Sequence, residues 1–153
     1  MRFLELRIPP LAVVALAACL MWAIARALPF LDLALPGREP AAIVAVVTGF
    51  LVSLAGVVAF RRARTTTSPL KPGSASSLVC GGIYRLTRNP MYLGLALALL
   101  GWGIFLANPA PFAMLFLFVG YMNRFQIVPE ERALEALFGE AFTAYRSKVR
   151  RWL

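Results

Sequence analysis

The side chains that could carry chemistry gather in two short stretches of the chain. The first is residues 81–94, where turn-forming and polar residues run directly into an apolar segment. Its polar members are Tyr84, Arg85, Arg88, Asn89 and Tyr92. The second stretch, residues 124–131, contributes Arg124, Gln126, Glu130 and Glu131. If the fold brings the two stretches together, cations, acids and an amide converge in one polar pocket.

The kinds of chemistry open to such a pocket are limited, because the chain has no histidine. The commonest general base and the commonest metal ligand are therefore missing, and a Ser-His catalytic pair is excluded. Cys19 lies within an apolar run and Cys80 within a polar one, so neither metal-ligand spacing nor a disulfide is expected. The pocket is better suited to binding and orienting a ligand than to proton transfer.

The composition indicates what must position these residues. Hydrophobic residues make up 60% of the 153-residue chain, well above the share of an ordinary soluble domain. Apolar runs lie at about 9–28, 41–60, 90–107 and 112–128, each near the length that crosses a bilayer as a helix. We predict an all-α, polytopic membrane protein with four transmembrane helices and a C-terminal amphipathic cytosolic helix at 130–149. It forms a single membrane-embedded domain, residues 1–153, with a cytosolic loop at 61–89.

Local signals bring the two polar stretches to one end of this bundle. Asn89 and Pro90 are favourable as the N-cap and first residue of the third helix. A tight turn at 108–111 makes the third and fourth helices an antiparallel pair, so the start of one lies beside the end of the other. Pro129 and the acids after it are suited to starting the last helix.

The basic residues predict the orientation in the membrane. With four spans both termini lie on one side, which carries 14 of the 16 Lys and Arg residues. These are Arg2, Arg7, Arg61, Arg62, Arg64, Lys71, Arg85, Arg88, Arg124, Arg132, Arg146, Lys148, Arg150 and Arg151. Arg26 and Arg38 lie opposite. The positive-inside rule makes the 14-residue side cytoplasmic, and the membrane is the inner, cytoplasmic one if the source is bacterial.

Several of these features also have a purely structural interpretation. The net charge of +9 does not indicate nucleic acid, because the cations lie at the ends of apolar runs, where they attract lipid headgroups. Any single arginine of the two stretches could extend to a phosphate, and Arg150, Arg151 and Trp152 are typical headgroup anchors. Small residues at helical spacing in 41–60, including Gly49, Ser53 and Gly56, indicate close helix packing. Membrane anchoring alone does not require two adjacent acids that face an Arg-Asn-Pro turn.

These two stretches resemble a known superfamily. The resemblance rests on Gly82, Tyr84, Arg88, Asn89, Pro90, Met91, Tyr92 and Gly94, followed by Pro129, Glu130, Glu131, Leu134, Phe138, Gly139 and Tyr145. The pattern is similar to the isoprenylcysteine carboxyl methyltransferase and phospholipid methyltransferase superfamily of integral membrane enzymes. It covers roughly residues 65–153. The usual turn of that superfamily is Arg-His-Pro-x-Tyr, and Asn89 takes the place of the histidine here, so a titrating role at that position is lost.

The resemblance implies a cofactor and its binding residues. The cofactor would be S-adenosyl-L-methionine. Its pocket would be lined by Tyr84, Arg88, Asn89, Pro90, Tyr92 and Gly94, and Glu130 and Glu131 would hold its polar groups. A catalytic role is expected for Tyr92, Glu131 and Arg124, the last as the group that orients an anionic acceptor or a lipid phosphate. No metal is implied.

The methyl acceptor is expected to be lipid-like or a small apolar molecule that presents a carboxylate, thiol or amine. Each of these can attack carbon directly, so the missing histidine does not oppose the activity. Membrane lipids are expected partners and nucleic acid is not. The alternative is a non-enzymatic four-helix membrane scaffold or small transporter subunit, although the spans lack the deep ionisable residue that transport usually needs.

Overall fold

A computed structural model describes residues 5–63 and 76–153 of the chain, and these residues form helices and connecting turns without any strand. The helices are α1 (Pro10–Ala27), α2 (Arg38–Arg62), α3 (Pro90–Leu106), α4 (Phe112–Tyr121), α5 (Val128–Phe138) and α6 (Glu140–Lys148). The predicted all-helical class is confirmed. Arg2, Arg64, Lys71 and part of the predicted loop at 61–89 lie outside the described residues.

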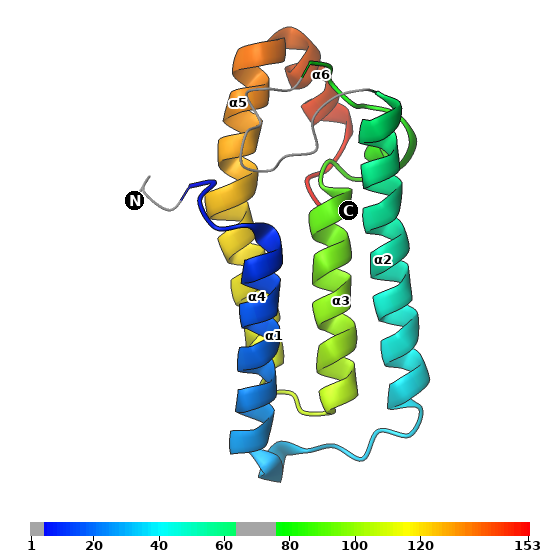
Figure 1. The fold of residues 1–153 in the computed structure, drawn as a ribbon, viewed down its shortest axis with the longest axis vertical. Helices are drawn as coiled ribbons and strands as arrows, with labels where there is room; N and C mark the ends of the chain where they lie inside the picture. The colour runs from blue at the N-terminus through cyan, green and yellow to red at the C-terminus, as the bar shows by residue number, and fades with distance from the viewer. Residues whose placement is uncertain (1–4, 64–75) are drawn as a thin grey trace.

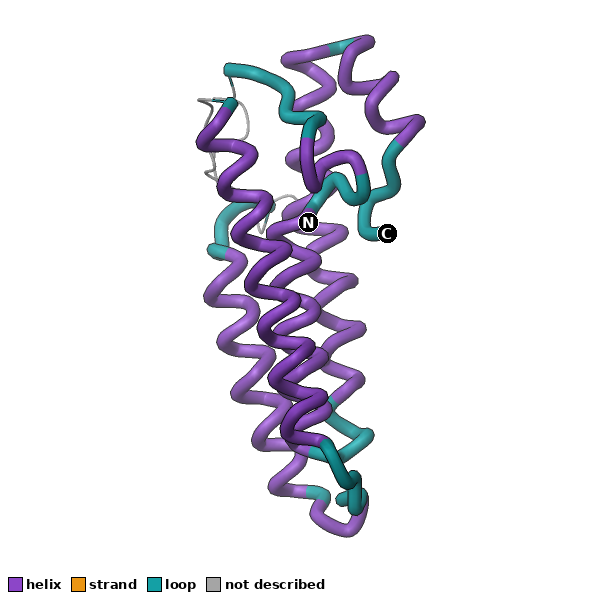
Figure 2. The backbone as a smooth tube through the Cα atoms, turned by 90° about the vertical axis from the view of Figure 1, so that its right-hand side faces the viewer, coloured by secondary structure: helices purple, strands orange, loops and turns teal. Residues whose placement is uncertain are grey.

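Helices α1, α2, α3 and α4 run side by side along the molecule, with α3 between α2 on one side and α1 and α4 on the other (Figure 1). The turned view shows an elongated bundle with the short helices α5 and α6 at one end (Figure 2). Among the described residues, three helical segments are long and apolar enough to cross a membrane: α1, α2 and the continuous segment Phe112–Phe138. Helix α3 is apolar but shorter, at 17 residues.

Glycines allow α2 and α3 to pack closely, as the small residues of 41–60 predict. A Cβ atom at Gly49 would lie 2.5 Å from the carbonyl oxygen of Gly94 and 3.0 Å from the Cβ of Leu97. A Cβ at Gly56 would lie 3.0 Å from Cγ of Pro90. Backbone therefore contacts backbone, and a side chain at these positions would force the helices apart.

The end of the bundle away from α5 and α6 is fixed by Asn108, which the sequence analysis did not single out. Its side chain is 1% exposed. The amide nitrogen donates to the carbonyl of Leu28 (2.9 Å) and to a carboxylate oxygen of Asp32 (2.8 Å), while its oxygen accepts from the Ala110 N–H (3.0 Å). This one side chain ties the turn between α3 and α4 to the segment that follows α1.

The fourth predicted helix does not end before Pro129, in contrast to the sequence-based boundary. A π-helical segment, Met122–Ile127, joins α4 to α5, and the N–H of Val128 donates to the carbonyl of Asn123. Pro129 has no N–H to offer the carbonyl of Phe125, four residues earlier. That carbonyl accepts instead from the N–H of Leu6 (3.0 Å). Pro129 lies in the first turn of α5, where a missing N–H is tolerated, as predicted from the sequence, and the N-terminal segment satisfies the carbonyl of Phe125.

The single helix predicted at 130–149 is divided in two. Gly139 has φ 50° and ψ −122°, a conformation that a residue with a side chain rarely adopts, and it separates α5 from α6. The chain turns back there, and α6 packs against α5 (Figure 1). As a result, residues 149–153 return to the start of α3.

Candidate functional site

The core of the site is the carboxylate of Glu131, which is held between two arginines. Arg88 donates from Nη2 to Oε1 at 2.9 Å. Arg151 donates from Nε to Oε1 at 3.1 Å and from Nη2 to Oε2 at 2.7 Å. The side chains of Arg88 and Glu131 are only 10% and 12% exposed. Burial lowers the pKa of the Arg88 guanidinium, and the neighbouring Glu131 carboxylate opposes that shift.

The second carboxylate of the site belongs to Glu130 and contacts α3. The hydroxyl of Tyr92 donates a hydrogen bond to Oε1 of Glu130. Oε2 of Glu130 accepts no hydrogen bond from the described residues, so it remains available as an acceptor. Tyr92 itself is buried and lies in the first turn of α3. The predicted meeting of the α3 start with the acidic pair is therefore observed.

Asn89 occupies the N-cap position of α3, but its side chain does not cap the helix. Its amide nitrogen donates to the carbonyl of Arg151 at 2.9 Å. The hydroxyl of Thr87, which is fully buried, donates to the same carbonyl at 3.3 Å. The N–H of Arg88 donates to the carbonyl of Arg150 at 3.0 Å. The turn before α3 therefore binds the end of the chain, a contact that the sequence analysis did not foresee.

Some donors at this end of the bundle have no partner among the described residues. Arg88 Nε is buried and makes no hydrogen bond. The N–H groups of Met91 and Tyr92, in the first turn of α3, have neither a helical acceptor nor a side-chain cap. Donors and a helix N-terminus of this kind suit an anionic group. We call Arg88, Asn89, Tyr92, Glu130 and Glu131 the polar cluster.

Three other residues predicted to line a cofactor pocket make different contacts. Pro90 is buried in the first turn of α3, where it meets Gly56 of α2. Gly94 faces α2, and a Cβ there would collide with Ser53 and with the backbone of Gly49. The carbonyl of Tyr84 accepts from the Tyr145 hydroxyl at 2.7 Å. All three help to pack the helices that carry the polar cluster.

Tyr84 lies in a short 3₁₀ turn, Gly82–Arg85, and its ring packs edge-on against Phe60 with centroids 5.4 Å apart. Burial raises the pKa of the Tyr84 hydroxyl well above its usual value. It therefore stays protonated and cannot serve as a base. Its contacts join α2 to α6.

Arg124 does not meet the polar cluster. Its side chain is 51% exposed and pairs with Glu5 at 3.0 Å, and Glu5 also contacts Arg132. Gln126, one turn before the acidic pair, is fully buried and donates to the carbonyl of Ile8 at 2.7 Å. Both residues attach the N-terminal segment to the π-helical segment. An acceptor-orienting role for Arg124 stays a prediction.

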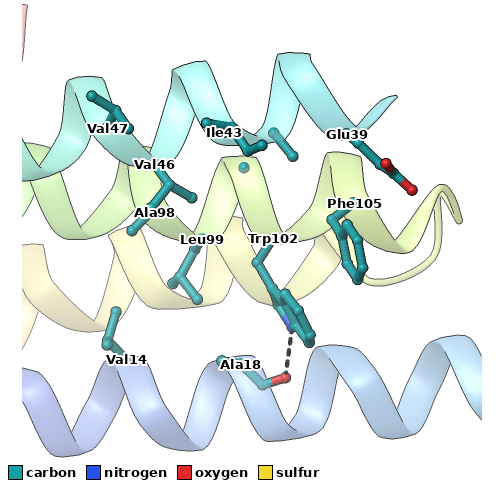
Figure 3. Close-up of a pocket in the computed structure, with 12 residues that line it drawn as sticks. Val14, Ala18, Glu39, Ile43, Val46, Val47, Ala98, Leu99, Trp102 and Phe105 are labelled. Carbon is teal, nitrogen blue, oxygen red and sulfur yellow. Dashed lines mark hydrogen bonds between the residues drawn. The ribbon is translucent and has the colours of Figure 1, made fainter. Parts of the chain in front are cut away.

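A groove of about 590 Å³ lies among α1, α2 and α3, away from the polar cluster. Its lining is almost entirely apolar and includes Val14, Ala18, Ile43, Val46, Leu99 and Trp102. In Figure 3 these side chains reach the groove from all three helices, and the Trp102 indole donates to the carbonyl of Ala18 at 3.0 Å. The groove suits an apolar chain, and its lining offers few partners to a ligand with several charges.

Fold and site together define a helical integral membrane protein with a polar cluster at one end of its bundle. The model of the phospholipid methyltransferase family matches residues 38–141, more than half of the chain, and the chain belongs to this family. The resemblance seen in the sequence is thereby confirmed. Family membership implies methyltransferase activity in a membrane.

An uncharacterised protein of Haemophilus influenzae is 44% identical over 63 residues, which are 41% of this chain and all of that protein. No solved structure matches the chain significantly. The family match includes every residue of the polar cluster. It excludes all of α1 and residues 149–153, so the contacts of Arg151 lie beyond the part of the chain that the family model describes.

Proposed function

We propose that this chain is an S-adenosyl-L-methionine-dependent membrane methyltransferase. The observation that carries the proposal is the combination, in one cluster, of unpartnered donors with an open carboxylate oxygen. Within residues 5–63 and 76–153, Arg88 Nε and the first N–H groups of α3 lack acceptors, and Oε2 of Glu130 lacks a donor. The cofactor carries a carboxylate at one point and an ammonium and ribose hydroxyls at others, so the residues present fit it.

The residues divide into two roles toward such a ligand. Arg88 and the N-terminus of α3 would bind its carboxylate, and Glu130 would accept a hydrogen bond from its ammonium or a ribose hydroxyl. Glu131 fixes the position of Arg88, and Tyr92 fixes that of Glu130. When bound, the cofactor supplies a methyl group activated by a sulfonium. The chain then needs to align the acceptor and exclude water, without an acid or base.

For the acceptor we propose a lipid-like or small apolar molecule with a carboxylate, thiol or amine. The apolar groove offers a surface for a hydrocarbon chain within the bilayer. It starts near Ala98, six residues beyond Tyr92, or about 9 Å along the helix. For Arg124 we propose only contact with an anionic headgroup, because its guanidinium is exposed beside Glu5.

Glu130→Gln is the most direct test of the cofactor contact. It keeps the shape of the side chain but replaces the carboxyl group that would face the ligand with an amide. We expect the affinity for S-adenosylhomocysteine, measured by calorimetric titration of the purified protein, to fall about tenfold or more. Glu140→Gln is the matched control, because Glu140 is exposed at the start of α6 and should leave the affinity unchanged.

Absence of binding by the folded unmodified protein would overturn the dependence on S-adenosylmethionine. Equal affinities for Glu130→Gln and the unmodified protein would remove Glu130 from the site. Solute or ion flux through the protein in liposomes, without methyl transfer, would favour the alternative of a transporter subunit.

We further propose that α3 is a fourth span and that the polar cluster faces the cytoplasm. Support comes from the position of α3, which packs against α1, α2 and α4 within the bundle (Figure 1). The basic segments around α5 and α6 share one end of the bundle, and the positive-inside rule favours the cytoplasm for that end. Both chain termini would then be cytoplasmic.

Thiol labelling tests this orientation. In a background with Cys19 and Cys80 replaced by serine, Leu35→Cys and Ser147→Cys place one exposed thiol at each end of the bundle. A membrane-impermeant reagent should label the first variant in intact cells and the second only after permeabilisation. The reverse pattern would place the polar cluster outside.

A further inference from the structure

We propose that residues 149–153 complete the cofactor site and that Arg151 is a positioning residue, which acts by holding Glu131 in place. The proposal rests on the proposed function of the polar cluster. It goes beyond the family match, which ends at residue 141. From here on we call residues 149–153 the C-terminal segment.

The C-terminal segment is bound along its backbone to the turn before α3. The carbonyl of Arg150 accepts from the N–H of Arg88, and the carbonyl of Arg151 accepts from both Thr87 and Asn89. Further along, the indole of Trp152 donates to the side chain of Asn123 at 3.0 Å. These contacts span the turn before α3 and the π-helical segment, so the segment has a defined place between the two halves of the site.

Arg151 and Arg88 hold Glu131 in different ways. Arg88 reaches only Oε1, with a single hydrogen bond. Arg151 contacts both carboxylate oxygens through two donors of its planar guanidinium. A two-point contact fixes the rotation of the carboxylate as well as its distance, which one hydrogen bond cannot do. Arg151 therefore sets how Glu131 presents its charge to Arg88.

The consequence for ligand binding follows from this chain of contacts. Arg88 carries the buried Nε that lacks an acceptor, and its side chain is anchored by Glu131 and by the carbonyl of Arg146 at 3.4 Å. Without Arg151, the Glu131 carboxylate can rotate and Arg88 loses its fixed position. The site keeps all of its ligand-contacting groups but loses their alignment.

The test compares Arg151→Ala, Arg151→Lys and the matched control Arg150→Ala. The side chain of Arg150 is exposed and makes no hydrogen bond to the described residues, so its replacement removes the same charge one position away. Calorimetric titration with S-adenosylhomocysteine gives the affinities. We expect the affinity to fall about tenfold for Arg151→Ala and less for Arg151→Lys. The lysine ammonium retains the positive charge but cannot make the two-point contact of a guanidinium. Arg150→Ala should match the unmodified protein.

A double variant shows whether Arg151 acts through Glu131. In a Glu131→Gln background, Arg151→Ala should cause little additional loss, because the partner that it positions has already changed. Independent, additive losses would overturn the positioning role, as would equal affinities of Arg151→Ala and the unmodified protein.

If Arg151→Ala does not fold, Arg151→Lys provides the test. An affinity of Arg151→Lys equal to that of the unmodified protein would then overturn the proposal. Failure of the unmodified protein to bind S-adenosylhomocysteine is a different result, because it contradicts the proposed function itself. Loss of binding in Arg150→Ala equal to that in Arg151→Ala would show a general effect of charge and would also overturn the proposal.

Discussion

Glu131→Ala is expected to reduce the affinity for S-adenosylhomocysteine by at least about 100-fold, the largest effect of any single change in the polar cluster. The reason is the pair of arginines that the carboxylate holds. The side chain of Arg88 is 10% exposed, and after the change the only hydrogen bond left to its guanidinium from the described residues would be a long one to the carbonyl of Arg146. Removing one partner of a buried ion pair typically costs about 3–5 kcal/mol, because the other charge stays buried and unpaired.

The direction of the Arg88 pKa supports this expectation. Burial already lowers that pKa, and Glu131 is the main group that opposes the shift. Without the carboxylate, the guanidinium would move toward solvent to regain its hydration. Such a movement would also take Nε away from the place where a ligand could meet it, so binding should be lost together with part of the stability.

Glu135→Ala is the matched control for this prediction. Glu135 is also an acid of α5 and also pairs with an arginine, Arg146, at 3.3 Å, but both side chains are more than 40% exposed. An exposed pair of this kind contributes about 0–1 kcal/mol. Calorimetric titration and thermal unfolding of the two variants in the same detergent give the comparison. Similar behaviour of Glu131→Ala and Glu135→Ala would show that the buried pair has no special role.

Gly94→Ala is expected to destabilise the bundle, although it adds one methyl group. The new Cβ would collide with the side chain of Ser53 and with the backbone carbonyl of Gly49 on α2. Because a carbonyl within a helix cannot move alone, the two helices must separate. Overpacking typically costs about 1–3 kcal/mol. In a chain of this size each kcal/mol shifts Tm by about 2–4 °C, so a loss of several degrees is expected.

The same variant separates two roles for Gly94. If the glycine serves mainly helix packing, Tm and ligand affinity should fall together, since α3 carries Asn89 and Tyr92 of the polar cluster. If it serves close approach of the cofactor, affinity should fall while Tm is unchanged. Gly120→Ala in α4 is the control, because a Cβ there meets nothing within 4 Å and should not lower stability.

The local sequence was sufficient to predict the helices and the family. Apolar runs of helix length, bounded by Pro36, Asn89 or arginines, indicate which segments lie in the bilayer. These segments must be helical, because every backbone polar group in a bilayer needs an internal hydrogen-bond partner. The tight turn around Asn108 makes α3 and α4 antiparallel. The position of Tyr92 beside Glu130 can therefore be predicted from the sequence alone.

The boundary at Pro129 could not be predicted in this way. Pro129 lies in the first turn of α5, as expected of a proline, but the sequence has no local sign that the preceding helix continues into α5 through a π-helical segment. At this junction the carbonyl of Phe125 accepts from the N–H of Leu6, a residue far away in the sequence. The division of the last helix at Gly139 had a local signal, because glycine favours positive φ, but the helical spacing of apolar residues on both sides concealed it.

The sequence by itself determined that this protein is a bundle of apolar helices with cations, acids and an amide gathered at one end. Those properties follow from composition and from short-range periodicity. Only the tertiary structure decided which of the charges meet. It joins Arg151 to Glu131, leaves Arg124 with Glu5 at the surface, and assigns Gly94 to the contact with α2. The physical reason is that an arginine near a helix end has the same local sequence whether it extends to a headgroup or to a buried carboxylate, and only the packing of distant segments separates the two.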